Sequence, residues 1–165
     1  MSDAVELLVR GIAIGIGGAA LMDAWALLVR VAFNVRGLDY ALLGRWIGHF
    51  PRRRFVHDRI AAADPIPGER PLGWVAHYAI GISFAMPLLA VWGLEWARSP
   101  TLWQPLLVGM VTIAGPWFVM QPAMGAGIAG SRSPNPGATR LRNLATHAVY
   151  GIGLYLSAVA LSVLT

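Results

Sequence analysis

The most constraining feature of the sequence is a set of four apolar stretches, each about as long as a membrane-spanning helix. They run near residues 8–29, 72–94, 103–128 and 144–165. A bilayer core about 30 Å thick needs roughly 20 mostly apolar residues in each helix that crosses it. The stretches fill more than half of the 165 residues. The sequence therefore predicts an all-α integral membrane protein with four transmembrane helices.

Composition supports this class and excludes several others. Hydrophobic residues make up 56% of the chain and charged residues only 13%, whereas soluble domains carry about a quarter charged residues. The chain has no cysteine, which excludes disulfide scaffolds, thiolate metal sites and cysteine nucleophiles. No nucleotide-binding loop or nucleophile elbow is present, so no motif indicates an enzyme. The basic residues lack a soluble domain that would present them to nucleic acid, so no nucleic-acid partner is expected.

The arginines predict the orientation of the four helices. All 13 basic residues are arginine, and only Arg10 and Arg98 lie outside the first and third connections. Loops on the cytoplasmic side of a membrane carry an excess of basic residues. We therefore expect residues 30–71 and 130–143 in the cytoplasm, with both termini on the opposite side. The eleven residues on the cytoplasmic side are Arg30, Arg36, Arg45, Arg52, Arg53, Arg54, Arg59, Arg70, Arg132, Arg140 and Arg142.

The two halves of the chain match each other at three places in the same order, which indicates an internal duplication. We expect two helical hairpins in parallel orientation within a single membrane domain of residues 1–165, with repeats of about 7–94 and 103–165. Chance similarity between apolar helices rich in glycine and alanine is the alternative. The matches pair Gly17, Met22 and Asp23 with Gly115, Met120 and Gln121, then residues 65–68 with 134–137, then residues 77–82 with 147–152.

Four polar side chains, Asp23, His77, Gln121 and His147, lie within the apolar stretches and form a predicted intramembrane polar layer. Each is five to eleven residues from a flanking arginine, which places all four roughly 8–16 Å inside the cytoplasmic boundary. Ionisable groups inside a membrane are costly and usually face the interior of the helix bundle. The layer is interpreted either as a proton relay or ligand pocket, or as hydrogen bonds that fix helix register.

The histidines and two nearby glycines of this layer also fit a haem site. His77 and His147 are suited to bis-imidazole ligation of haem, and Gly81 and Gly151, one turn further along, would admit a flat macrocycle. The same glycines would also allow helices to pack closely.

The third stretch contains two proline positions that should interrupt its helix. Pro116 and Pro122 each remove a backbone donor, so we expect a broken helix close to Gln121. Such breaks are tolerated where they pack in protein or line a cavity. A packing kink and a ligand pocket are both compatible with this pattern.

The first connection is long and rich in arginine. Asp39 is expected to cap a short interfacial helix that ends near His49. The spacing of His49, His57 and Asp58 matches no zinc signature, so no metal site is predicted. Arginines near a bilayer surface are attracted to anionic lipid headgroups, and this role is assigned to Arg45, Arg52, Arg53, Arg54 and Arg59.

Several motifs together resemble the bacterial inner-membrane family catalogued as domain of unknown function 2938. The resemblance covers nearly the whole chain and implies a bacterial four-span inner-membrane protein. It supplies no established activity and no catalytic residues. The motifs lie in residues 42–49, 65–70, 73–78, 119–125 and 133–136, the last two reading Val-Met-Gln-Pro-Ala-Met-Gly and Ser-Pro-Asn-Pro.

The function expected from these features is the handling of an ion, a proton or a small molecule through the intramembrane polar layer. Asp23 would accept the proton or cation, and His77 and His147 would tune it. One alternative is a structural or assembly subunit of a larger membrane complex. The other is a haem- or tetrapyrrole-binding membrane protein. A homodimer or a complex with another membrane protein is compatible with four short helices.

Overall fold

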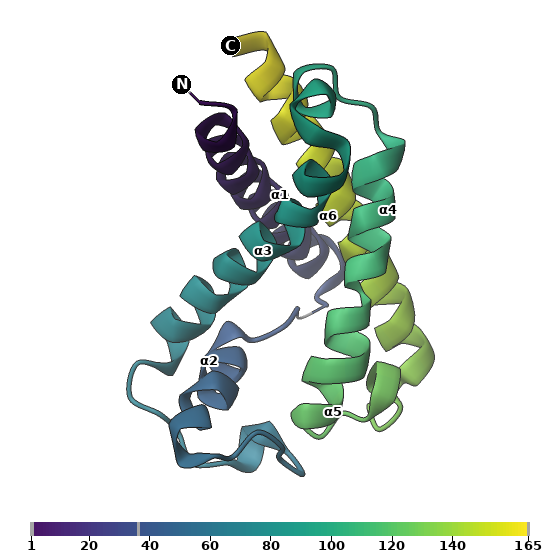
Figure 1. Cartoon of the computed structure of the whole chain (residues 1–165). Coiled ribbons are helices and arrows are strands. Elements are labelled where there is room, and N and C mark those ends of the chain that lie inside the picture. Colours follow the sequence, from purple (N-terminus) through teal and green to yellow (C-terminus); the bar gives the residue numbers. More distant parts are fainter. Residues whose placement is uncertain (1, 36, 165) are drawn as a thin grey trace. The chain divides into compact units, whose positions relative to one another are not determined.

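The computed structural model describes residues 2–35 and 37–164, and this part of the chain is helical without any β-strand. Arg36, one of the arginines assigned to the cytoplasmic side, and Thr165, the expected end of the fourth span, lie outside the described residues. The helices (Figure 1) are α1 (Asp3–Phe33), α2 (Tyr40–Gly48), α3 (Glu69–Arg98), α4 (Trp103–Thr112), α5 (Gln121–Ala123) and α6 (Pro136–Leu164), with a π-helix at Gly115–Met120 and short 3-10 helices at Phe50–Arg52, Ile60–Ala62 and Ile128–Gly130.

Four helical segments are long and apolar enough to cross a membrane. Large apolar side chains on α1, such as Leu27 and Leu28, are 60% and 53% exposed. A surface of this kind is suited to lipid rather than to water. These findings confirm the prediction of an all-helical protein with four helices suited to a bilayer. The segments are Asp3–Phe33, Glu69–Arg98, Trp103–Ala123 and Pro136–Leu164.

Two helix boundaries differ from those expected. α6 begins at Pro136, so the second half of the loop predicted over residues 130–143 is helical. Proline is favoured at the first helical position because it has no amide hydrogen to lose there. The third span ends at Ala123 rather than near residue 128. Gly125 and Gly127 follow it with φ of 91° and 74°, and this left-handed backbone ends a helix.

The third span is irregular, as its prolines predict. α4 ends at Thr112, and a π-helix follows from Gly115 to Met120. The amide of Gln121 donates to the carbonyl of Pro116, five residues earlier, which is the hydrogen bond of a π-helix. This break at Pro116 places Gln121 at the start of α5.

The chain forms two compact units, which are described separately below. Unit 1 takes in the described residues of 1–36, 78–112 and 145–165, and unit 2 takes in 37–77 and 113–144. α3 and α6 each contribute residues to both units. Neither unit is therefore a continuous segment of the sequence.

Unit 1 is held by close approach of helix backbones at glycines. A Cβ atom added to Gly15 of α1 would lie 2.6 Å from Cα of Ile82 in α3. One added to Gly109 of α4 would lie 2.6 Å from the carbonyl oxygen of His147 in α6. Small residues at such contacts are typical of membrane helices, which pack by van der Waals contact and hydrogen bonds rather than by the hydrophobic effect.

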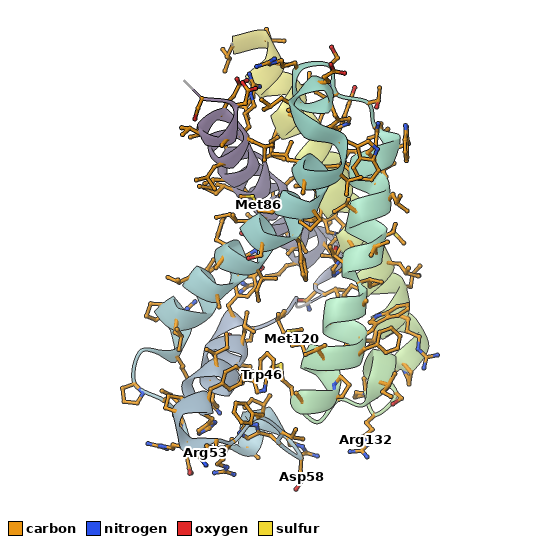
Figure 2. The ribbon with its side chains drawn as sticks, viewed as in Figure 1. Trp46, Arg53, Asp58, Met86, Met120 and Arg132 are labelled. Carbon is orange, nitrogen blue, oxygen red and sulfur yellow. The ribbon has the colours of Figure 1, made fainter. Side chains whose placement is uncertain are left out.

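Larger side chains fill the space around these contacts. Ile14, Leu89 and Leu154 are fully buried in unit 1. The hydroxyl of Tyr150 donates to the carbonyl oxygen of Gly81 at 2.5 Å, which joins α6 to α3. Further along α3, the Met86 side chain labelled in Figure 2 packs where a Cβ on Gly11 of α1 would stand.

Unit 2 begins with the short helix expected in the first connection. The Asp39 carboxylate accepts from the amide of Ala41 at 3.0 Å, which confirms the predicted cap of α2. α2 then packs against the start of α3 through Gly44 and Gly73. A Cβ on Gly44 would collide with the carbonyl of Glu69, so only glycine permits this contact.

Arg45 occupies a different environment from the lipid-facing one expected for it. Its Nη2 and Nε each lie 2.8 Å from a carboxylate oxygen of Glu69. Nη1 donates to the carbonyls of Ala61 and Ala63 at 3.2 and 3.1 Å. The ion pair with Glu69 raises the pKa of Arg45 above its usual value. Arg45 thus joins the first connection to α3, because its guanidinium donates to the Glu69 carboxylate and to two carbonyl oxygens of the connection at the same time.

The rest of the first connection docks against the end of the third span within unit 2. The amide of His57 donates to the carbonyl of Ala123 at 2.8 Å, and that of Ile60 to Met124 at 3.1 Å. Arg52, Arg53, Arg54 and Arg59 remain exposed on this loop, where Figure 2 labels Arg53 and Asp58.

The glycine contacts give a direct prediction for stability. Gly15→Ala places a Cβ against the α3 backbone, which no side-chain rotation relieves, so we expect a loss of about 1–3 kcal/mol of unfolding free energy. The measurement is reversible unfolding in mixed micelles.

Gly137→Ala provides the matched control, because its Cβ would meet no atom nearer than 3.7 Å. An exposed helical glycine replaced by alanine gains up to about 1 kcal/mol. Equal losses of unfolding free energy in Gly15→Ala and Gly137→Ala would contradict the role given to backbone contact at Gly15.

Candidate intramembrane site

Asp23 lies in α1 of unit 1 and is partly buried. The hydroxyl of Tyr78, on α3, donates to Oδ2 of Asp23 at 3.0 Å. The sequence predicts Asp23 as a member of the polar layer together with His77, the neighbour of Tyr78, but not Tyr78 itself. In the sequence, only its position next to His77 marks Tyr78 as a residue near the predicted site. The hydrogen bond fixes the orientation of the carboxylate, because α1 and α3 pack closely one to two turns away at Gly15 and Ile82.

His147 lies in the part of α6 that belongs to unit 1 and is 8% exposed. Its Nδ1 lies 3.1 Å from Oγ1 of Thr112 and 3.2 Å from the carbonyl oxygen of Gly109. A carbonyl oxygen only accepts, so Nδ1 carries the hydrogen in this contact. The Thr112 hydroxyl itself donates to the same carbonyl at 2.7 Å. A neutral His147 then keeps the lone pair on Nε2.

His77 lies in unit 2 and belongs to an aromatic group. Its Nε2 lies 3.2 Å from the hydroxyl of Tyr40. The two rings stack with centroids 4.4 Å apart, and Trp74 meets Tyr40 edge-on at 4.5 Å. Tyr40 is not among the residues of the predicted site. Its contact with His77 follows from the glycine packing of α2 on α3.

Gln121 also lies in unit 2, at the start of α5. Its Nε2 donates to the side-chain oxygen of Asn143 at 2.6 Å, and the indole of Trp117 donates to the same oxygen at 3.0 Å. The side-chain nitrogen of Asn143 donates to the carbonyl of Thr139 at 3.2 Å. Oε1 of Gln121 is buried and has no hydrogen-bond partner among the described residues. Asn143 was absent from the predicted site.

The structure thus gives each residue of the intramembrane polar layer a polar neighbour from another helix. Asp23 and His147 belong to unit 1, whereas His77 and Gln121 belong to unit 2. That the four side chains share one layer remains a prediction.

The residues assigned to a helix break or pocket have different surroundings. Pro116 and Pro122 lie in the π-helix and in α5. A Cβ on Gly81 would lie 3.2 Å from Cβ of Ala19, and one on Gly151 would lie 2.7 Å from the carbonyl oxygen of Pro105. These contacts support close helix packing and leave no room for a macrocycle directly beside either glycine.

A second pair of histidines, in the first connection, is buried within unit 2. Nδ1 of His49 lies 3.1 Å from Nε2 of His57, and the two residues are 0% and 6% exposed. Burial, and then the charges of His49 and Arg54, lower the pKa of His57. Residues 2–35 and 37–164 contain no group of three or more His, Asp or Glu side chains that could hold a metal ion.

The His57 environment predicts that loop docking weakens in acid. His57 is docked in its neutral form, so the undocked loop binds a proton more readily. Docking is complete above the ordinary histidine pKa of about 6.5 and weakens as the pH falls through it toward the lowered value. Hydrogen-exchange protection of the His57 amide should therefore decrease between pH 7.5 and 5.5, while that of the Ile14 amide in α1 stays constant. His57→Gln should abolish the difference, and pH-independent protection in the unsubstituted chain would contradict it.

Comparison with known proteins identifies a family for the chain. No curated protein and no solved structure matches the chain. The matching family model covers residues 12–161, which include the second and third spans, most of the first and fourth, and every residue of the intramembrane polar layer. The chain belongs to the family described as Protein of unknown function (DUF2938).

Proposed function

We propose that the chain is a bacterial inner-membrane protein that exchanges a proton or a small cation at Asp23. The observation that carries this proposal is the contact between Asp23 and Tyr78 inside unit 1, at 3.0 Å. A carboxylate within a span is costly, at about 2.5–3.5 kcal/mol near the helix centre. Such groups are found mainly where they bind or transfer charge.

Tyr78 is a suitable partner for this role because it is a neutral donor. Its hydrogen bond orients the carboxylate without adding a charge. A protonated Asp23 retains an oxygen that accepts from the same hydroxyl, so the contact is compatible with both states. His147, in the same unit, supplies an imidazole whose Nδ1 is held by Gly109 and Thr112. His77 and Gln121 complete the proposed polar layer.

The proposed orientation places the arginine-rich connections in the cytoplasm and both termini in the periplasm. Only two of the 13 basic residues, Arg10 and Arg98, lie outside the two connections proposed to be cytoplasmic. The exposed Arg52, Arg53 and Arg54 are followed by exposed Phe55 and Val56. This combination is suited to anionic headgroups, with the apolar side chains inserting below them.

The proposed duplication into two hairpins is supported by a repeated contact in unit 1. A Cβ on Gly15 would lie 3.2 Å from the carbonyl oxygen of Gly81. A Cβ on Gly109 would lie 2.9 Å from Cα of Gly151. Each hairpin, α1 with α3 and α4 with α6, therefore closes at a pair of glycines. Gly81 and Gly151 are matched residues of the two repeats, whereas Gly15 and Gly109 are not.

One alternative function also has a specific observation in its favour. The hydrogen bonds of Asp23, His147 and Gln121 each join two helices. Bonds of this kind stabilise helix pairs by about 0.6–2 kcal/mol and fix register. In a structural or assembly subunit of a larger complex, these residues would only stabilise the helix pairs and fix their register.

Asp23→Asn separates the two functions. The amide keeps an oxygen that accepts from Tyr78 but does not ionise. We expect the purified chain in liposomes with an internal pH dye to pass protons when a membrane potential is applied. The asparagine variant should lose most of this flux, and Tyr78→Phe should retain part of it, because the carboxylate remains. Thermal midpoints of the variants in detergent serve as the folding control.

If the flux of Asp23→Asn equals that of the unsubstituted chain, the proposal fails. Absence of flux in every protein, combined with destabilisation by Tyr78→Phe, would instead favour the structural subunit.

A further inference from the structure

The first connection caps the end of the third span within unit 2. The amides of His57 and Ile60 donate to the carbonyls of Ala123 and Met124 at 2.8 and 3.1 Å. The last carbonyls of a helix have no partner inside it, so an external donor stabilises the helix end. α5 has only three residues and follows a π-helix, and so short a helix has little stability of its own. Docking of the connection therefore holds α5 in place.

The position of Gln121 depends on this cap. Gln121 is the first residue of α5, and its side chain donates to the side-chain oxygen of Asn143 at 2.6 Å. Two residues beyond Met124, the amide of Ala126 donates to the carbonyl of Gln121 at 2.8 Å. A change in the docked connection would therefore reach a residue of the intramembrane polar layer.

The same connection contains the two buried histidines, His49 and His57. Nδ1 of His49 lies 3.1 Å from Nε2 of His57, so one of these nitrogens carries a hydrogen and the other accepts it. The other two ring nitrogens, Nε2 of His49 and Nδ1 of His57, are buried without a hydrogen-bond partner in the described part of the chain. A first added proton therefore creates a buried charge whose N–H group has no acceptor, and a second breaks the hydrogen bond between the rings.

An open cavity of about 330 Å³ gives solvent access to the edge of this pair. His57 lines it together with the exposed Arg54, Asp58 and Arg59. Asp58 contributes a carboxylate, but solvent screens its charge. Burial, then the charges of His49 and Arg54, lower the pKa of His57. The docked connection thus favours neutral histidines.

The elements packed against the connection offer no free carboxylate to an added proton. Glu69, at the start of α3, is close enough for the charge of His49 to act on it. Its carboxylate is already paired with the guanidinium of Arg45 at 2.8 Å. Residues 121–128, at the end of the third span, contain no titratable side chain.

We propose that the His49–His57 pair is a pH switch that controls the end of the third span. When the pair is neutral, the rings share one hydrogen bond and the connection caps α5. When the pair takes up protons, the connection separates from the third span, and α5 loosens together with the Gln121 side chain. The switch does not depend on proton exchange at Asp23. In the proposed orientation it responds to the pH of the cytoplasm.

Distance measurement by pulsed electron resonance on the full chain in lipid nanodiscs tests this switch. The chain has no cysteine, so Val56→Cys and Ile128→Cys, at side chains 72% and 58% exposed, place two spin labels within unit 2. We expect a population with longer distances to grow as the pH falls from about 7.5 to about 5.5, across the histidine range. The double substitution His49→Gln and His57→Gln, which leaves no titratable group in the pair, should abolish this growth.

Two exposed arginines that line the cavity give a matched pair of variants. Arg54→Gln removes a charge that opposes a proton on docked His57. The docked connection then tolerates that proton better, so the population with longer distances should grow less in acid. Arg59→Gln removes an arginine that is not among the charges acting on His57 and should leave the acid response unchanged.

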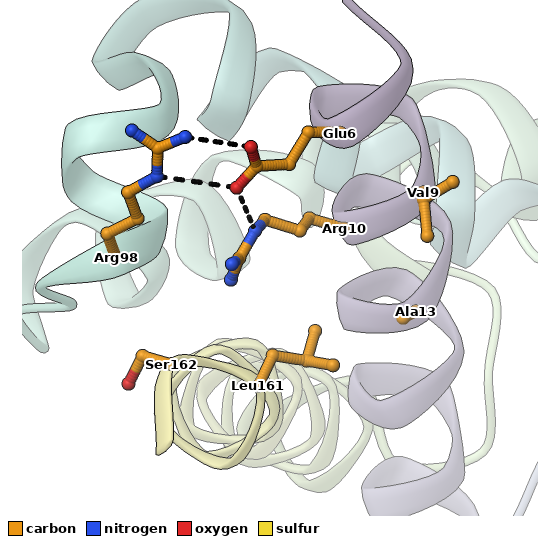
Figure 3. Close-up of a pocket in the computed structure, with 7 residues that line it drawn as sticks. All are labelled: Glu6, Val9, Arg10, Ala13, Arg98, Leu161 and Ser162. Atoms are coloured by element: carbon orange, nitrogen blue, oxygen red, sulfur yellow. Dashed lines mark hydrogen bonds and ion pairs between the residues drawn. The ribbon is translucent and has the colours of Figure 1, made fainter. Parts of the chain in front are cut away.

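Hydrogen exchange, corrected for the intrinsic effect of pH, reports on α5. Exchange at the amides of Met124 and Ala126 should rise over the same pH range. Unit 1 is the internal control. Figure 3 shows its Glu6 carboxylate between Arg98 and Arg10, at 2.7 and 2.8 Å. Glutamate ionises near about pH 4.3, so these ion pairs persist and exchange in α1 should stay constant.

Four results would overturn the proposal. Distances that do not change with pH, or that still lengthen in acid in the double glutamine variant, would exclude the histidine pair as the switch. Equal effects of Arg54→Gln and Arg59→Gln would exclude the role of charge beside His57. Separation of the labels without faster exchange at Met124 and Ala126 would exclude control of α5. The acid response should be the same in Asp23→Asn, which removes only the proposed proton exchange.

Discussion

Close contact between helix backbones is the constraint on which unit 1 depends. Lipid is as apolar as the helix surfaces, so little is gained by burying leucine against leucine inside a bilayer. Contact between backbones at Gly15 and Ile82, and at Gly109 and His147, brings enough atoms together to hold the helices. Dispersion contacts are individually small and collectively large. In unit 2, α2 and α3 make the same kind of close backbone contact at Gly44 and Gly73.

The polar contacts follow from this packing. Tyr78 reaches Asp23 because α1 and α3 are already in contact nearby, and His147 reaches the Gly109 carbonyl because no side chain stands between α4 and α6. Tyr150 joins α6 to α3 at the carbonyl of Gly81 in the same way. A larger residue at these glycines would therefore disturb hydrogen bonds as well as packing. The proposed proton chemistry depends on helix positions that the glycines determine.

Much of the fold was predictable from the sequence, because length and hydropathy determine spans, Asp39 is a cap, and prolines interrupt a helix. The partners of the polar residues were not predictable. Tyr78 and Thr112 lie in stretches that are apolar on nearly every side, so the sequence pattern does not encode how each helix is rotated. Asn143 lies within residues 130–143, which the sequence predicts as a loop but which are helical from Pro136. The sequence also does not indicate the ion pair of Arg45, because Glu69 is 24 residues away along the chain. The prediction of the polar residues themselves rested on the cost of burying them, and this cost is a property of each residue alone.

The proposed function requires Asp23 to change its protonation state inside the membrane while its hydrogen bond with Tyr78 is kept. Infrared difference spectroscopy of the full chain in lipid vesicles, recorded on stepping the pH, observes protonated and ionised carboxyl groups directly. If Asp23 changes its protonation state as proposed, a carboxyl band should disappear in Asp23→Asn and shift in Tyr78→Phe, because the phenol is hydrogen-bonded to that carboxyl group. A difference spectrum unchanged by Asp23→Asn over the accessible pH range would contradict it.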